Sequence, residues 1–260
     1  MNSSTDKRKV AIVTGARRGI GRAIAGCLAD AGFDLVLNDL ERDAAFEETS
    51  RSLHERGATA VAVIGDIAEP STHRAICDAA TRELGRIDCL VNNAGIQVSR
   101  REDLMRVTPE SFDRLMHVNL RGTFFLTQAV AARMIEDADH REGRCIVTIS
   151  SANAAMASVE KAEYCIAKTG LSMMNKLFAL RLARHGIACH EIQPGLIDTD
   201  MIAPAHAAYS ERIREGLTPI QRWGAPADIG RTVAALAQGA LPFTTGHAFQ
   251  VDGGLQLARL

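Results

Sequence analysis

Short apolar runs alternate with longer amphipathic segments along this chain of 260 residues. The first run, Lys9–Thr14, is rich in β-branched residues and stops at a glycine-rich segment, which is typical of a buried strand. Comparable runs predict six further strands, at residues 33–38, 59–64, 87–91, 144–150, 187–193 and 246–251. The amphipathic segments predict helices, from Gly21 to about residue 31, at 43–56, 70–84, 108–135 and 162–185, and from residue 226 onward.

This order of elements predicts parallel strands in one sheet with helices on both of its faces. The sequence has no linker, low-complexity tract or internal repeat, so we expect one doubly wound α/β domain across residues 1–260. The least regular segment, residues 201–224, follows the end of a strand and contains the single tryptophan, Trp223. Such an insertion favours a lid or a wall of a substrate site.

Composition argues against several classes of protein. The chain is 47% hydrophobic and 23% charged, with a net charge of −1, which favours neither nucleic acid nor an anionic membrane as a partner. No apolar run approaches the roughly 20 residues that cross a bilayer, and we see no signal peptide. The six cysteines and eight histidines lack the spacing of metal ligands. We therefore expect a cytoplasmic protein without a metal site.

The segment between the first strand and the first helix has the pattern Thr14-Gly15-x-x-x-Gly19-x-Gly21. Glycines permit a tight turn and a close approach of the backbone to a pyrophosphate, and the start of the helix supplies unpaired N–H groups. A glycine triplet alone also suits any tight turn. Its place between a strand and a helix, with Asp39 at the end of the next strand, favours dinucleotide binding.

Asp39 and the two arginines of the glycine-rich segment point to different cofactors. A carboxylate at the end of the second strand accepts hydrogen bonds from the adenosine ribose and repels a 2′-phosphate, so it favours NAD(H) over NADP(H). Arg17 and Arg18 favour NADP(H), because both could bind that phosphate. We expect the protein to prefer NAD(H) because of Asp39, although this residue could instead have a structural role in a turn or as a helix cap.

A tyrosine and a lysine in the helix predicted at 162–185 are candidate catalytic residues. Tyr164 and Lys168 are four residues apart and so lie on one face of a helix. A nearby cation lowers the pKa of a tyrosine, which then exchanges a proton with an oxygen near neutral pH. Ser151, at the end of an apolar run, could hold that oxygen. Taken alone, the pair could also be an ordinary contact on a helix surface.

Five motifs in order resemble the short-chain dehydrogenase/reductase family: the glycine-rich segment, Asn92-Asn-Ala-Gly95, Ser151, Tyr164-x-x-x-Lys168 and Pro194-Gly195. The match extends from about Val10 to Gly254. The resemblance implies a Rossmann-like fold with a seven-stranded sheet, hydride transfer between a ketone and a secondary alcohol, and a homotetramer. It also implies that the serine lies about thirteen residues before the tyrosine, which Ser151 satisfies and Ser150 does not.

The resemblance assigns a role to residues in each motif. Asn119 in His-Val-Asn-Leu becomes a fourth catalytic residue beside Ser151, Tyr164 and Lys168. Tyr164 and Lys168 would also touch the cofactor, whose other predicted contacts are Gly15, Arg18, Gly19, Ile20, Gly21, Asp39, Asp66, Ile67, Asn93, Ala94, Gly95, Pro194, Gly195, Ile197 and Thr199.

The segment Pro194-Gly-Leu-Ile-Asp-Thr-Asp-Met201 is similar to that of 3-oxoacyl-[acyl-carrier-protein] reductases, so we expect an oxidoreductase of that kind. Asp39 argues against the NADPH that such enzymes generally use, and the acidic segment 136–143 argues against an acyl carrier protein as a partner. An NAD-dependent dehydrogenase of a sugar, polyol or other secondary alcohol is the alternative. A non-catalytic dinucleotide sensor is a remote one. We expect a small-molecule substrate and further copies of the chain as partners, with an acyl carrier protein as a possible but doubtful one and neither nucleic acid nor a membrane.

Overall fold

A computed structural model describes residues 8–137 and 143–258. Within them, seven parallel strands form one sheet in the order β3-β2-β1-β4-β5-β6-β7. The strands are β1 (Lys9–Thr14), β2 (Phe33–Asp39), β3 (Ala60–Ile64), β4 (Cys89–Asn92), β5 (Arg144–Ile149), β6 (Ile187–Pro194) and β7 (His247–Val251). The predicted doubly wound, seven-stranded α/β fold is confirmed, and each strand begins and ends within two residues of its predicted bounds.

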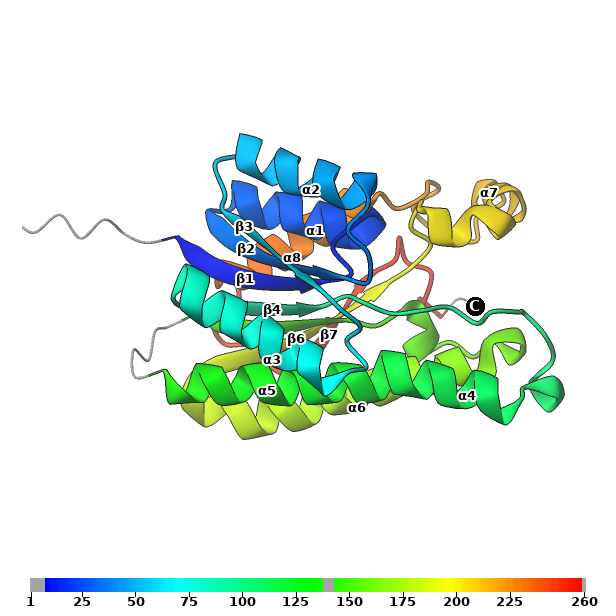
Figure 1. Cartoon of the computed structure of the whole chain (residues 1–260). Coiled ribbons are helices and arrows are strands. Elements are labelled where there is room, and N and C mark those ends of the chain that lie inside the picture. The colour runs from blue at the N-terminus through cyan, green and yellow to red at the C-terminus, as the bar shows by residue number, and fades with distance from the viewer. Residues whose placement is uncertain (1–7, 138–142, 259–260) are drawn as a thin grey trace, which may run out of the picture.

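Helices cover both faces of the sheet (Figure 1). One face carries α1 (Gly19–Asp30), α2 (Ala44–Glu55) and α8 (Pro226–Ala237). The other carries α3 (Pro70–Asp78), α4 (Pro109–Leu115), α5 (Thr123–Glu136) and α6 (Ala162–Leu182). Each layer has its own apolar core, with Ile24, Phe46 and Val233 buried on the first face and Ile76, Leu126 and Leu182 buried on the second. None of the helices in the described residues is long and apolar enough to cross a membrane.

Two segments differ from the sequence-based expectation. The long helix expected at 108–135 is interrupted between α4 and α5 by a π-helical segment, η3 (Met116–Gly122), which contains Asn119. The segment 201–224 is more regular than expected, because it contains the 3₁₀ helix η7 (Asp200–Ala205) and α7 (His206–Arg214). Trp223 donates a hydrogen bond from Nε1 to Ser210 of α7 and stacks on His206. Residues 138–142 of the acidic segment lie outside the described residues.

The order of strands determines where a ligand can bind. The chain moves outward in one direction from β1 to β2 and β3, and in the opposite direction from β4 to β5, β6 and β7. Because β1 and β4 are neighbours, the loops after them diverge and leave a crevice at the carboxyl ends of the strands. The predicted lid, with η7 and α7, follows β6 at this same edge of the sheet (Figure 1).

Candidate active site

A cleft of about 610 Å³ lies at the carboxyl ends of the strands. It brings together the glycine-rich segment, the ends of β2, β4, β5 and β6, the start of α6 and the lid. Every predicted site residue except Asn119 lines this cleft: Gly15, Arg17, Arg18, Gly19, Ile20, Gly21, Asp39, Asp66, Ile67, Asn93, Ala94, Gly95, Ser151, Tyr164, Lys168, Pro194, Gly195, Ile197 and Thr199. The five motifs, far apart in the sequence, thus form one site.

The glycine-rich turn leaves no room for side chains. A Cβ atom on Gly21 would lie 1.9 Å from the backbone oxygen of Gly15, and a Cβ on Gly15 would lie 3.0 Å from the Cα of Ala94. Gly15 and Gly19 also have positive φ angles, of 64° and 56°, that disfavour other residues. Helix α1 begins here, and Arg18 at its N-cap makes no side-chain hydrogen bond to the helix. The first N–H groups of α1 therefore face the cleft as donors, which suits a pyrophosphate.

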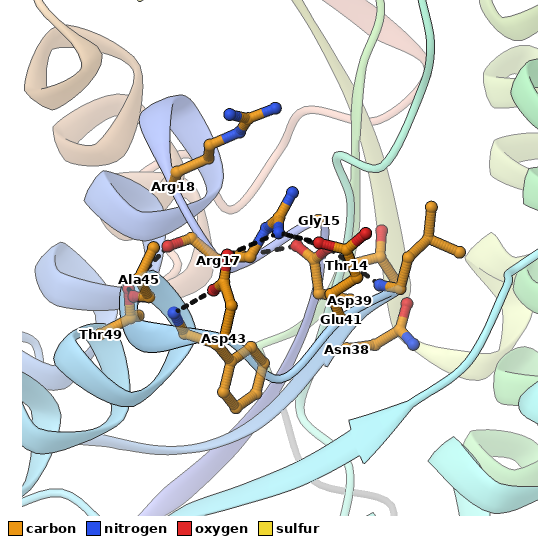
Figure 2. Close-up of polar contacts among 12 residues, drawn as sticks. Thr14, Gly15, Arg17, Arg18, Asn38, Asp39, Glu41, Asp43, Ala45 and Thr49 are labelled. Carbon is orange, nitrogen blue, oxygen red and sulfur yellow. Dashed lines mark hydrogen bonds and ion pairs between the residues drawn. The ribbon is translucent and has the colours of Figure 1, made fainter. Parts of the chain in front are cut away.

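Arg17 is surrounded by carboxylates, as Figure 2 shows. Its guanidinium bonds Glu41 and lies 2.8 Å from Asp43, and its Nε is 3.7 Å from Asp39. Its backbone N–H donates to Asp39 at 3.0 Å, while Asp39 also accepts from the N–H of Leu40 at 2.9 Å. Asp39 is thus anchored at the end of β2 with its side chain only 14% exposed. Arg18 extends away from this group, and its guanidinium lies 3.6 Å from Asp200.

Ser151, Tyr164 and Lys168 meet where β5 ends and α6 begins. Tyr164 and Lys168 are both buried, and the Lys168 ammonium lies 5.6 Å from the centre of the Tyr164 ring. Lys168 donates a hydrogen bond to the backbone oxygen of Ile149 at 3.0 Å, which fixes the ammonium beneath the end of β5. Ser151 is half-buried at the start of the following turn and hydrogen-bonds with the Tyr164 side chain. A carbonyl oxygen placed between Ser151 and Tyr164 would receive hydrogen bonds from two hydroxyl groups.

The predicted lowering of the Tyr164 pKa is wrong for the protein without a bound ligand. The sequence predicted a pKa lowered by Lys168, but burial raises the pKa of Tyr164 to about 12 and the hydrogen bond with Ser151 offsets only part of this rise. The Lys168 ammonium bonds Ile149 rather than the phenol oxygen. Burial also lowers the pKa of Lys168, to about 8, while the negative charge of Glu191 limits the fall. Of these two residues, Lys168 therefore has the pKa closer to neutral pH.

Asn119 lies behind the cleft rather than in its wall. Its side chain is buried, accepts a hydrogen bond from the N–H of Ile96 at 2.8 Å and donates to the oxygen of Ile96 at 2.9 Å. A Cβ on Gly95 would lie 3.2 Å from Asn119 Oδ1 and 3.8 Å from Lys168 Nζ, so the amide and the ammonium approach each other under Gly95. The π-helical turn of η3 directs Asn119 toward the loop after β4.

Three polar residues near the catalytic group were missed in the sequence. Glu191, on β6, is buried and accepts hydrogen bonds from Ser150, from Ser172 at 2.6 Å and from Gln193 at 2.9 Å. A charged residue within an otherwise buried strand was the signal that could have revealed it. Lys161 and Gln97 also line the cleft. Lys161 stands three residues before Tyr164, and Gln97 two residues after Gly95, so proximity to the motifs was the available signal.

Comparisons with known proteins identify the family of the chain. The family model described as enoyl-(acyl carrier protein) reductase matches residues 15–256. A 3-oxoacyl-[acyl-carrier protein] reductase from Brucella melitensis, whose crystal structure is a complex with NAD, is 46% identical, with a TM-score of 0.94 over 97% of this chain and 99% of that one. L-rhamnose 1-dehydrogenase (NAD(P)(+)) from Sphingomonas sp. is 33% identical over 95% of this chain and 96% of that protein.

A further solved structure, a gluconate 5-dehydrogenase from Burkholderia cenocepacia in complex with NADP and tartrate, is 35% identical, with a TM-score of 0.87 over 96% of both chains. The chain belongs to the short-chain dehydrogenase/reductase family. It is an oxidoreductase that acts on alcohol or ketone groups with a nicotinamide dinucleotide cofactor. The Brucella protein and the two sugar dehydrogenases show that relatives of similar fold carry names with different substrates.

We predict that Lys168 titrates near pH 8 and that Glu191→Gln moves this titration to lower pH. The amide has nearly the shape of the carboxylate but lacks the negative charge that favours the ammonium. The measurement is an NMR titration of lysine-labelled protein. Ser172→Ala is the control, because it removes one hydrogen bond to Glu191 and leaves the charge in place. A Lys168 pKa near the ordinary 10.5, or no fall in Glu191→Gln, would contradict the prediction.

Proposed function

We propose that the chain is an NAD(H)-dependent oxidoreductase that interconverts a 3-oxoacyl thioester and its 3-hydroxy form. The observation that carries the proposal is the convergence of Ser151, Tyr164 and Lys168 in the same cleft as the glycine-rich turn. The name of the Brucella relative, at 46% identity, supports the thioester as substrate. The acyl carrier protein is a doubtful partner, because carboxylates in the segment between α5 and β5 would repel an acidic carrier. We propose a cytoplasmic location.

Bound NAD(H) would accept or supply the hydride, and the protein would orient the substrate and move the proton. Ser151 would hold the substrate oxygen by a hydrogen bond, and Tyr164 would give a proton to this oxygen or take one from it. Lys168 would bind the hydroxyls of the nicotinamide ribose and supply positive charge beneath Tyr164. Asn119 would hold the loop after β4 through Ile96 and so keep Gly95 close to Lys168.

The preference for NAD(H) follows from the charges around the adenosine end. Asp39 presents a carboxylate that bonds two backbone N–H groups and is held in place by them. Arg17 already contacts three carboxylates, so its charge is compensated before any phosphate arrives. A 2′-phosphate would have to approach Asp39, Glu41 and Asp43 together, and like charges at such short range cost several kcal/mol.

A dehydrogenase of a sugar or another polar secondary alcohol is the second candidate. The walls of the cleft near Tyr164 carry polar side chains, among them Asn153, Ser158 and Gln97, which suit a substrate with several hydroxyl groups. The names of the Sphingomonas and Burkholderia relatives support this candidate.

We also propose that the chain forms a homotetramer in which α5 and α6 supply one of the interfaces. A groove of about 970 Å³ between α4, η3, α5 and α6 is lined mainly by apolar side chains, including Phe124, Met173 and Leu177. The polar side chains that also line it are Asp113, Arg114, His117 and Arg121. Met173 and Leu177 are 56% and 54% exposed. An apolar face formed by one pair of helices can pack against the same face of a second copy about a twofold axis.

We expect Tyr164→Phe to fold and bind NAD(H) but to lose about 10²–10⁴-fold in turnover, since the variant lacks only the hydroxyl that moves the proton. Turnover is measured as the change in NADH absorbance with a 3-oxoacyl thioester and with a panel of sugars. Phe178→Tyr, which changes another aromatic side chain of α6 remote from the cleft, tests for nonspecific effects. More than a tenth of the wild-type turnover in Tyr164→Phe would exclude the role proposed for Tyr164.

We expect the wild-type kcat/KM to be higher with NADH than with NADPH. Asp39→Asn should reduce the ratio of kcat/KM with NADH to kcat/KM with NADPH. The triple variant that adds Glu41→Gln and Asp43→Asn should prefer NADPH, because Arg17 is then free to bind the 2′-phosphate. Asparagine at 43 also preserves the N-cap of α2. Glu55→Gln, at the exposed end of α2, controls for net charge. A wild type that prefers NADPH would overturn the assignment.

We expect Leu177→Arg to break the assembly, because the charge would be buried against a second copy. Sedimentation velocity would then show a smaller species than the wild type. Met105→Arg, at an 85% exposed position outside the groove, is the matched control and should leave the sedimentation coefficient unchanged. A monomeric wild type at micromolar concentration would rule out the proposed interface.

A further inference from the structure

A lysine without an anionic partner lies beside the catalytic tyrosine. Lys161 ends the 3₁₀ turn η5 (Val159–Lys161), just before α6, and its Nζ lies 5.8 Å from the centre of the Tyr164 ring. Its ammonium donates to Asn153 Oδ1 at 2.8 Å. Asn153 in turn donates its backbone N–H to Ser151 Oγ at 3.1 Å. Within the described residues, no carboxylate lies within 4.0 Å of Lys161.

The surroundings make this charge costly in the protein alone. Lys161 is half-buried, and burial lowers its pKa. The positive charge of Arg101 acts in the same direction, and Tyr209, Cys165 and Glu160 offset part of the fall. A partly desolvated ammonium that bonds only a neutral amide lacks the compensation that a carboxylate would give. An anion that enters the cleft would supply this compensation and would gain a charge-assisted hydrogen bond.

Among the charged side chains that line the cleft, cations outnumber carboxylates at this end. Asp39 and Asp66 lie at the adenosine end, and Asp200 faces Arg18. Around Tyr164 and α7, the charged side chains that line the cleft are the cations Lys161, Lys168 and Arg212, whereas η7 of the lid contributes the carboxylate of Asp200. Arg212 extends from α7, where its guanidinium lies 5.6 Å from the Tyr209 ring.

A second polar side chain that lines the cleft has an unpaired atom among the described residues. Gln97 follows the loop after β4, lines the cleft and has a buried Oε1 that accepts no hydrogen bond from any described residue. Such an atom is costly to bury unless a ligand completes its hydrogen bonds. Lys161 thus offers an ammonium to a carboxylate, and Gln97 offers an acceptor to a hydroxyl group of the same ligand.

We propose that the substrate carries a carboxylate and that Lys161 binds it. The substrate is then a short hydroxy acid or oxo acid, or a sugar acid, whose carboxylate lies within a few bonds of the carbon that exchanges the hydride. The inference rests on the proposed reaction and favours the second candidate over the thioester: the polar secondary alcohol, or its ketone, carries a free carboxylate. Lys161 touches the substrate at a point remote from the reacting bond, so it determines affinity rather than the chemical step.

Two matched pairs of compounds test whether the cleft prefers a substrate with a carboxylate. The first pair is 3-oxobutanoate and its methyl ester, assayed with NADH. The second pair is gluconate and glucitol, assayed with NAD⁺. We expect kcat/KM to favour the acid in at least one pair. Lys161→Met should raise KM for that acid about 10- to 100-fold, the usual worth of a charged hydrogen bond, and leave KM for its neutral counterpart within about twofold. Lys161→Arg should recover most of the affinity. Lys176→Met, an exposed lysine of α6 outside the cleft, is the control.

Binding is measured separately from turnover by calorimetry on Tyr164→Phe saturated with cofactor, with and without Lys161→Met. The carboxylate site is supported if the acid binds more tightly than its neutral counterpart and the Lys161→Met double variant loses this difference. This holds even if the wild type turns over neither pair of compounds. Absence of turnover with both pairs would refute only the proposed reaction. Equal or weaker binding of the acid in both pairs, or an equal loss for acid and neutral compound in Lys161→Met, would overturn the carboxylate site.

Discussion

The divergence of the chain at the neighbouring strands β1 and β4 determines the position of every functional group in this molecule. Parallel strands all end at one edge of the sheet, and only between β1 and β4 do the following loops turn away from each other. Asn93 closes the floor of the resulting crevice, since its amide donates to the backbone oxygens of Thr14 and Gly15. The glycine-rich turn and the loop after β4 are thereby held together, which fixes the turn where a pyrophosphate would bind.

Buried charges are placed on opposite sides of this crevice and are compensated in different ways. At the adenosine end, Asp39 and Arg17 form part of a group of opposite charges that compensate one another. At the catalytic end, Lys168 bonds a carbonyl oxygen, and the nearest compensation is Glu191 on β6. Glu191 is itself held by three donors, so its charge is stable in the core. The protein therefore keeps a cation under Tyr164 without letting a carboxylate reach the substrate.

The sequence predicted the fold and the members of the site because both depend on local patterns. The apolar runs that form β1 and β5 can each be recognised from their own residues, and a motif follows each run directly in the sequence. The interruption at η3 was not readable, since residues 116–122 continue the helical pattern; it depends on contacts with distant segments. Asn119 pairs with Ile96, and Gly122 packs so closely that a Cβ would lie 2.7 Å from the oxygen of Ile67. The ion pair between Arg17 and Asp43 was not predictable from the local sequence either, because the two residues are 26 positions apart.

The charged side chains at the two ends of the cleft differ in sign, which favours one orientation of an elongated ligand. An elongated ligand with a neutral ribose at one end fits the carboxylate of Asp39, which would repel a phosphate at that position. At the other end, the cations Lys161 and Arg212 face the space beside Tyr164. Arg212 belongs to the lid, and Trp223 ties this helix to Gly224, whose backbone bonds Leu196 and Asp198 after β6. Because Arg212 lies on α7, a closure of this segment over the proposed anionic substrate would be favoured electrostatically.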